Sequence, residues 1–175
     1  EQPSLDRWSS EKALGEEAFL AESRWYKNWG YHWNYYRDIF LFARENGIPM
    51  FGVNLPRAAV QTIRMKGFDA LAPEHRALLP EKVDVENAEH QRLFKAFFGS
   101  EDALHGNMPE PMFQAMFRAQ CAWDAGMAWN AAQALKKHGG EKAIMVVLIG
   151  SGHVAYGLGA ERQAKLWFDG RTASV

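Results

Sequence analysis

The sequence predicts an α/β protein in which a mostly parallel sheet is flanked by helices. Residues 143–149 (AIMVVLI) form an unbroken apolar run rich in β-branched side chains, which is typical of a strand buried on both faces. Residues 48–53 (IPMFGV) have the length and composition of a second short buried strand. Between the two runs the sequence predicts mainly helices.

The chain is predicted to form a single domain, residues 1–175, which is long enough to bury a real core. Residues 58–106 are predicted to form a helical insertion or small subdomain. A long helix is expected from about 111 to 137, because cations and two glycines follow its apolar pattern. Shorter helices are expected at residues 10–21, 56–66, 73–79 and 87–98. The abrupt start and end of the sequence indicate a fragment of a longer protein.

Composition excludes several classes of protein. The formal net charge is -1 and no basic block is present, so a nucleic-acid footprint is not supported. The lone Cys121 excludes an internal disulfide, and no apolar run approaches the length of a membrane span. The seven Trp residues are enough to furnish a binding wall as well as a core.

Aromatic residues are concentrated between Trp25 and Tyr36, and this segment is predicted to be helical. One face of that helix carries residues at i, i+4, i+7 and i+11: Trp29, Trp33, Tyr36 and Phe40. The face is interpreted as core. Tyr31 and Tyr35 fall on other faces, which favours a ligand or a partner surface for them.

The first candidate site follows the predicted strand at 143–149. Gly150 and Gly152 allow the backbone to turn sharply and to approach a ligand closely. In open α/β sheets the ligand crevice lies beyond the carboxyl ends of the strands. His153 and Tyr156 are therefore expected to lie at the ligand crevice.

A second polar group follows the other predicted strand. Asn54 and Arg57 flank Pro56, which suits the first turn of a helix because it lacks an N–H. If the two strands are parallel, Asn54, Arg57 and His153 converge on one edge of the sheet.

The long helix carries a polar pair on its apolar stripe, namely Gln120 and Asp124. A buried carboxylate is costly unless it is paired or protonated, so Asp124 is expected to have a partner. Arg57 and His153 are the two candidates. The pair could hold the helix to the sheet or take part in function, and the sequence leaves both interpretations open.

Other catalytic arrangements are less well supported. A triad of Ser151, His153 and Asp124 can be drawn, but the sequence has no nucleophile elbow to support it. His75, His90 and His105 show no i, i+4 metal spacing and are expected to lie on the surface.

Three motifs in a fixed order carry a resemblance to a known family. They are NLPR at 54–57, RAQ at 118–120 followed by Asp124 and MA at 127–128, and GSGHV at 150–154. This combination resembles the ChaN-like haem-binding uptake lipoproteins of the Tiki superfamily, over nearly the whole chain. The family also has an upstream strand with a Gly-Glu-x-His motif that this sequence lacks. The fragment is therefore expected to lack that first strand and any metal chemistry that depends on it.

The resemblance implies haem as cofactor, bound through a tyrosine with a histidine nearby, at a homodimer interface. Tyr156 is the expected ligand of the haem iron and His153 its support, although Tyr31 and Tyr35 are rivals and Tyr156 could be an ordinary loop residue. Gly150 and Gly152 would shape the loop, with Gln120 and Asp124 supporting it. The expected porphyrin wall is Trp25, Trp29 and Tyr31, and the expected propionate partners are Arg57 and Arg162.

The resemblance also implies a lipid-anchored protein outside the cytoplasm, with the anchor beyond this chain. A non-enzymatic haem binder is the favoured function. The alternative is a metal-dependent hydrolase of the Tiki or erythromycin-esterase type, in which His153 would be a metal ligand or general base and Asp124 an orienting carboxylate.

Overall fold

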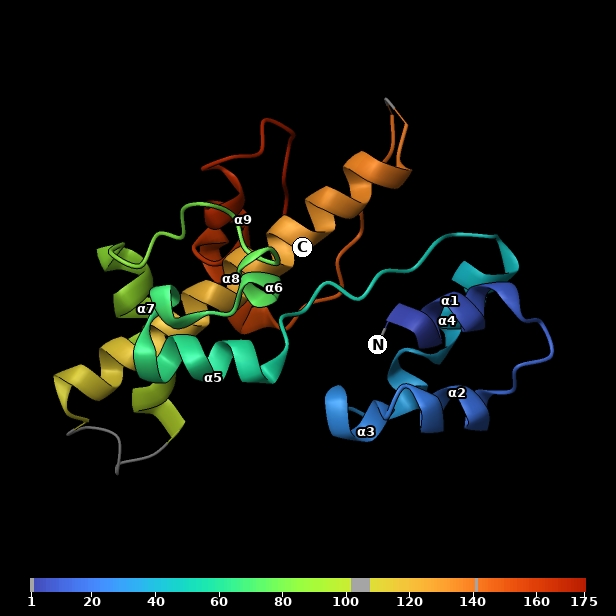
Figure 1. Ribbon diagram of the computed structural model, residues 1–175, viewed down its shortest axis with the longest axis horizontal. Coiled ribbons are helices and arrows are strands. Elements are labelled where there is room, and N and C mark those ends of the chain that lie inside the picture. The colour runs from blue at the N-terminus through green and yellow to red at the C-terminus, as the bar shows by residue number, and fades with distance from the viewer. Residues whose placement is uncertain (1, 102–107, 141) are drawn as a thin grey trace. The chain divides into compact units, whose positions relative to one another are not determined.

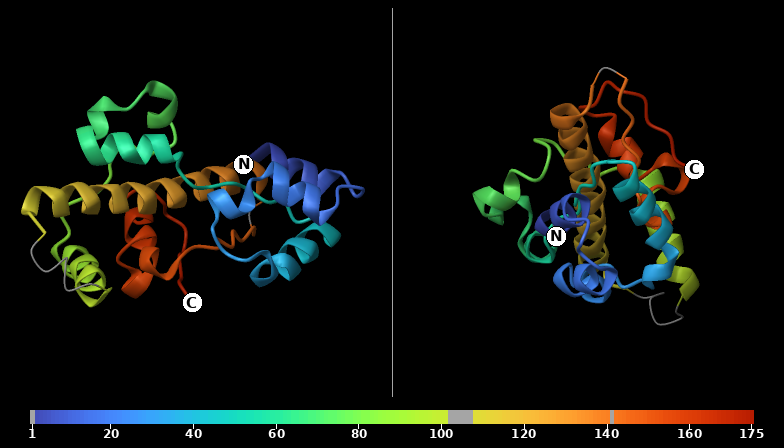
Figure 2. Two further views of the ribbon diagram at one scale, coloured as in Figure 1. Left: turned by 90° about the horizontal axis from the view of Figure 1, so that it is seen from below. Right: turned by 90° about the vertical axis from the view of Figure 1, so that its right-hand side faces the viewer.

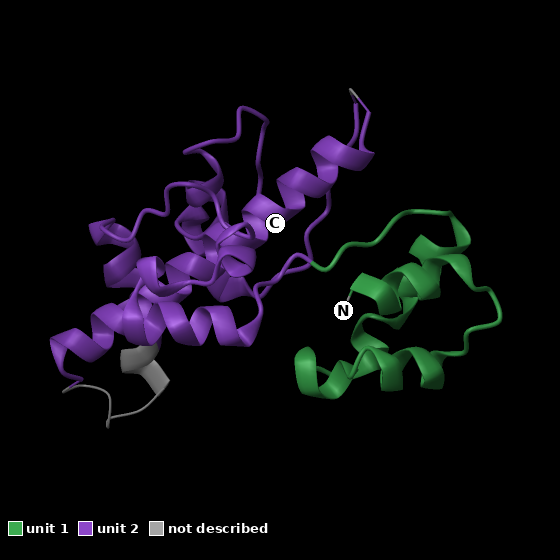
Figure 3. Cartoon of the chain, in the orientation of Figure 1, with its two compact units in different colours: residues 1–52 green, residues 53–175 purple. Residues whose placement is uncertain are grey.

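The computed structural model describes residues 2–101, 108–140 and 142–175, and the elements are labelled in Figure 1. The chain divides into two compact units, residues 1–52 and 53–175 (Figure 3). Each unit has its own hydrophobic cluster and is described by itself. Within the described residues, no helix is both long and apolar enough to span a membrane.

The first unit is built from short helices around an aromatic cluster. Its elements are α1 (Gln2–Ser10), α2 (Glu16–Glu22), α3 (Trp25–Asn28), the 3-10 turn η1 (Trp33–Tyr35) and α4 (Arg37–Glu45). Trp8, Phe19, Trp25 and Trp33 are buried in the cluster. The Glu16 carboxylate accepts hydrogen bonds from the Trp33 indole at 2.8 Å and from Arg37 at 2.7 Å, which fixes the edge of this core.

The single helix predicted through the aromatic segment is wrong. Gly30 has a φ of 83°, a left-handed conformation that a helix cannot continue through, and the segment breaks into α3, η1 and α4. The interpretation of its apolar face as core is confirmed, because Trp33 is buried and Trp29, Tyr36 and Phe40 pack against the same cluster.

The second unit is organised around one long helix. Its elements are α5 (Arg57–Lys66), η2 (Phe68–Ala70), α6 (Pro73–Arg76), α7 (Ala88–Glu101), α8 (Glu110–His138), η4 (Ser151–His153), η5 (Ala155–Gly157) and α9 (Ala160–Ala164). Both α5 and α9 pack along α8, which runs the length of the unit in both views of Figure 2. The helix expected at 111–137 is thus confirmed.

Most predicted helix ends are also confirmed in this unit. α5 begins after Pro56 and ends before Gly67, whose φ is 88°. Asn87 caps α7, since its side-chain oxygen accepts the backbone N–H of His90 at 2.8 Å. α7 extends to Glu101 rather than ending at residue 98, and α6 is shorter than expected. The loop predicted at 100–111 lies largely outside the described residues.

The predicted α/β fold is wrong, because the described residues contain helices and no strand. Residues 48–53 and 143–149 both run as irregular backbone without strand pairing. Ile144 is 86% exposed and Val146 is 77% exposed, so the second run is not buried on both faces. β-branched side chains favour extended backbone, but a strand also needs a neighbour that completes its hydrogen-bond ladder.

Gly126 allows α8 to approach the segment before α5 closely. A Cβ atom built on Gly126 would lie 2.6 Å from Cγ of Leu55, which is in the segment that leads into α5. Leu55 is buried in the same cluster as Val60, Ile63 and Ala122. The α5–α8 contact therefore depends on the missing side chain at residue 126.

Substitution Gly126→Ala tests this contact. Alanine should gain about 1 kcal/mol in helix propensity but lose about 1–3 kcal/mol to overpacking against Leu55. We expect net destabilisation in urea unfolding, and net stabilisation when the same substitution is made in a Leu55→Ala background. Equal effects in the two backgrounds would show that Leu55 is not the obstructing group. The exposed Gln133→Ala on α8 is the control.

Candidate functional site

The centre of the candidate site is a carboxylate–histidine pair. Asp124 on α8 is fully buried, and its Oδ1 lies 2.6 Å from Nδ1 of His153, in η4. The imidazole itself is 25% exposed. The prediction that Asp124 has a partner is confirmed, and of the two candidates the structure pairs it with His153.

Gln120 joins the pair from one turn earlier on α8. Its Nε2 donates to Asp124 Oδ1 at 3.2 Å and to the Gly152 carbonyl at 3.3 Å, and lies 2.9 Å from His153 Nδ1. When Nδ1 carries a proton it donates to the Asp124 carboxylate, because the amide nitrogen of Gln120 is itself a donor. One amide thus ties the helix to the loop that carries His153.

The loop after His153 has an unusual backbone at Tyr156. This residue has a φ of 55°, a left-handed conformation that costs a non-glycine residue about 1–2 kcal/mol. Its side chain is 86% exposed, so no packing interaction repays that cost. A strained, outward-facing phenol three positions after His153 is a candidate functional group.

Gly159, which the sequence analysis missed, is a glycine that this loop requires. A Cβ atom there would overlap the carbonyl oxygen of His153 and lie 3.2 Å from Asp124 Oδ2. The two glycines that were predicted, Gly150 and Gly152, have no positive φ. Gly150 instead accepts the N–H of His153 at 2.9 Å and so begins the η4 turn.

A second buried histidine lies beside the pair, and the prediction that His90 is on the surface is wrong. His90 on α7 is 2% exposed, and its Nε2 lies 3.6 Å from Asp124 Oδ2. Its ring packs edge-to-face on Phe117 at 4.9 Å. The i, i+4 spacing of His90 and Phe94, both against Phe117, was the sequence signal for an inward-facing histidine.

Arg162, expected as a propionate partner, is paired with a carboxylate of its own chain. It forms an ion pair with Asp84, and it also donates to the Leu158 carbonyl at 2.9 Å. The buried Gln163 accepts from the Asp84 N–H at 3.1 Å and donates to the Asp84 carbonyl at 2.6 Å. α9 is thereby fastened to the segment before α7.

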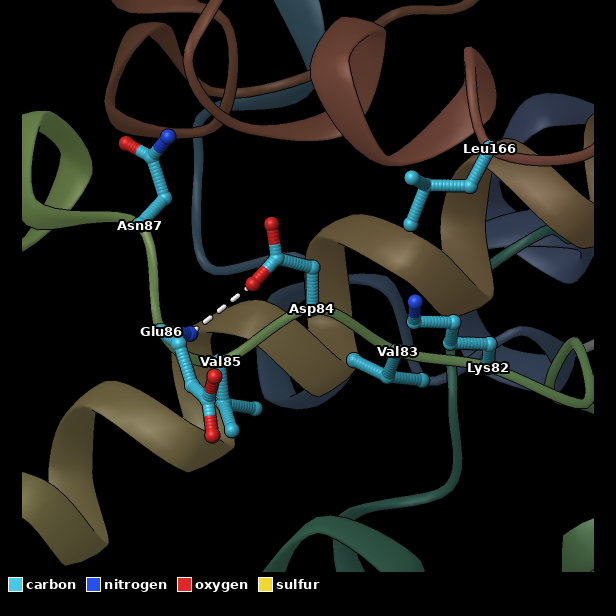
Figure 4. A pocket seen from close by; sticks show the side chains of 7 residues that line it. All are labelled: Lys82, Val83, Asp84, Val85, Glu86, Asn87 and Leu166. Atoms are coloured by element: carbon cyan, nitrogen blue, oxygen red, sulfur yellow. Dashed lines mark hydrogen bonds between the residues drawn. The ribbon is translucent and has the colours of Figure 1, made fainter.

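The segment around Asp84 lines a pocket of about 470 Å³, shown in Figure 4. It is bordered by residues 82–87 and by Leu166, and the Asp84 carboxylate accepts the Glu86 N–H at 2.8 Å. Neither His153 nor Tyr156 is among the residues lining it. The pocket therefore does not define the candidate site.

The remaining predicted residues lie elsewhere in their units. Asn54 is exposed, and its side chain accepts the N–H of Leu55 at 2.8 Å. Arg57 is the exposed first residue of α5. Trp29 and Tyr31 belong to the first unit, where their rings are 6.3 Å apart. In the part of the chain that the structure describes, no group of three His, Cys, Asp or Glu residues is arranged to hold a metal ion.

Burial shifts the pKa values of Asp124 and His90 in opposite directions. It raises the pKa of Asp124 to about 6, an effect that the hydrogen bond from His153 opposes. It lowers the pKa of His90 to about 4, with help from the charge of Arg162. Both groups therefore titrate between pH 4 and 6.5, and their effects on stability have opposite signs.

The variant Asp124→Asn should separate the two effects. In the folded protein Asp124 holds its proton to a higher pH than in the unfolded chain, so its contribution to stability falls as the pH rises from about 4 to 6. Folded His90 releases its proton at a lower pH than the unfolded chain does, so its contribution to stability rises over about pH 4 to 6.5. A difference of one bound proton between the folded and unfolded states changes the free energy of unfolding by about 1.4 kcal/mol per pH unit.

The stability of the wild type relative to Asp124→Asn should therefore decrease between pH 4 and 6, as measured by urea unfolding at a series of pH values. Groups that do not contact Asp124 cancel in this difference. Asp169→Asn, an exposed carboxylate, should show no such slope. A flat difference for Asp124→Asn would contradict the raised pKa.

Comparison with known protein families gives a match over most of the chain. Residues 1–163 match the family described as haem-binding uptake, Tiki superfamily, ChaN. Comparisons with curated proteins and with solved structures give no match. All the site residues described above, from Asp84 to Gln163, lie within the matched range. The chain belongs to the ChaN family of haem-binding uptake proteins in the Tiki superfamily.

Proposed function

We propose that this protein is a haem carrier that binds the haem iron through Tyr156, with His153 beside it. The observation that carries this proposal is the loop at 150–159, in which a strained and exposed phenol follows a histidine held by a buried carboxylate. When bound, haem would supply an iron that Tyr156 could hold through its phenol oxygen. Membership of a haem-binding family supports the choice of cofactor.

His153 has the hydrogen bonding expected of a residue that assists an iron site. Histidines near metals commonly give one ring N–H to a carboxylate, which fixes the tautomer and the ring orientation. In this protein Asp124 is that carboxylate, and its Oδ1 lies next to His153 Nδ1. Nε2 is then the ring nitrogen that would serve the phenolate oxygen or a propionate. The donor set therefore fits haem.

The alternative function is hydrolysis, and one observation favours it. The same His153–Asp124 pair would suit a general base, with Asp124 orienting the ring and stabilising its protonated form. In that case His153 Nε2 would take a proton from water. Ester or peptide hydrolysis that depends on His153, in a protein that does not bind hemin, would favour this alternative.

Hemin titration tests the proposed ligand. We expect a saturable red shift of the Soret band with the wild type, and a loss of affinity of about tenfold or more for Tyr156→Phe, because phenylalanine offers no oxygen to the iron. Tyr26→Phe is the matched control, since Tyr26 is also an exposed tyrosine and is not a candidate ligand. Tyr31→Phe and Tyr35→Phe test the two rival ligands. An unchanged hemin spectrum for Tyr156→Phe would show that Tyr156 is not the iron ligand.

We propose that the protein forms a homodimer through exposed apolar residues that precede the loop at 150–159. Ile144, Val146 and Leu148 alternate along the backbone and are 86%, 77% and 40% exposed. Exposed apolar patches of this kind often mark protein interfaces. A lipid anchor and a location outside the cytoplasm stay predictions from the resemblance.

The variant Val146→Glu should shift the protein toward monomer in sedimentation experiments, because a charge in an apolar interface must be desolvated. The exposed Gln133→Glu is the control for added charge. Wild-type protein that is monomeric with and without hemin at micromolar concentration would remove the dimer from the proposal.

A further inference from the structure

The buried carboxylate of Asp124 lies between two imidazoles. His153 meets Oδ1 at 2.6 Å, and His90 Nε2 lies 3.6 Å from Oδ2. Among the described residues, Oδ2 has no hydrogen-bond partner although it is buried. A buried acceptor without a partner costs about 1–3 kcal/mol, and more when it is charged. His90 is therefore placed where the carboxylate lacks a donor.

The neighbour of the other ring nitrogen determines which nitrogen of His90 carries the proton. Cys121 Sγ lies 3.9 Å from His90 Nδ1, and the thiol is fully buried. Burial raises the pKa of Cys121 and lowers that of His90 to about 4, so at neutral pH the thiol is protonated and the imidazole is neutral. The S–H can then donate to Nδ1, which leaves the ring proton on Nε2, facing Asp124.

The gap between His90 and Asp124 is small enough to close. A separation of 3.6 Å exceeds a normal N–H···O hydrogen bond by about 0.6 Å, and it leaves no room for a water between the two atoms. Gly159 lies against Oδ2 and Gln120 binds Oδ1, so the carboxylate has little freedom to rotate away. A slight rotation of the His90 side chain toward Oδ2 would form the bond.

We propose that His90 is a positioning residue of the site, which donates from Nε2 to Asp124 Oδ2 and so orients the carboxylate that holds His153. Its effect on haem binding rests on the proposed function, whereas its effect on the His153–Asp124 bond does not. The competing interpretation is that His90 only fills space beside Phe117.

Two substitutions separate these roles in the full chain without haem. His90→Gln keeps an amide nitrogen near the position of Nε2, whereas His90→Phe keeps a ring against Phe117 but removes the donor. The measurement is the far-downfield proton resonance of His153 Nδ1–H, assigned by its loss in His153→Gln. We expect the resonance in the wild type and in His90→Gln, and its loss or broadening in His90→Phe.

Several outcomes would overturn the proposal. These are retention of the resonance in His90→Phe and its absence from the wild type at neutral pH. If His90→Phe does not fold, His90→Asn takes its place, because its shorter amide cannot reach Oδ2. A wild-type nitrogen-15 spectrum that places the His90 proton on Nδ1 would also refute the proposal, and this measurement needs no variant.

Hemin affinity is the second readout. His90→Phe should bind hemin about tenfold more weakly than wild type, as is typical when a partner of a ligand-supporting histidine is lost, and His90→Gln should bind close to wild type. Equal hemin affinity of the wild type and His90→Phe would count against the positioning role. If the wild type binds no hemin, the proposed function fails, but the resonance experiment still decides the role of His90.

Discussion

The structure of the second unit depends on one buried charge. Asp124 sits at the middle of α8 with no exposed surface, and a carboxylate in that position is tolerated only with partners. It obtains them from the loop after residue 150 and from its own helix. The loop must therefore lie against α8, and Gly159 is needed because any side chain there would strike the His153 carbonyl.

The same arrangement divides the site into a fixed part and an open part. Nδ1 of His153 is held by hydrogen bonding inside the unit, whereas Tyr156 extends into solvent from a strained backbone position. A fixed histidine costs little ordering entropy when a ligand arrives, and an exposed phenol can be reached without opening the core. Both properties suit the proposed haem carrier, whose ligand would be large and flat.

What the sequence revealed about the site came from local patterns. Asp124 and Gln120 were found because they interrupt the apolar stripe of a helix, a misfit visible within a few turns. His90 and Gly159 were missed as neighbours of Asp124, because these contacts join residues that are distant in sequence. Only the inward orientation of His90 had a local signal. The predicted sheet failed for the same reason, since apolar β-branched runs favour extended backbone but their pairing depends on a neighbour that local composition does not specify.

A polar residue that interrupts an apolar pattern was therefore a more reliable signal than a run that fits the pattern of a buried strand. An apolar run such as 143–149 satisfies the pattern of a buried strand yet is largely exposed at Ile144 and Val146, so the pattern alone did not determine the environment. A carboxylate on an apolar stripe has few solutions, because every arrangement that buries it must also bring a donor to it. The paired, buried carboxylate was therefore predictable at Asp124, where an unpaired charge would cost most. The helices that pack around it were predictable from their periodicity.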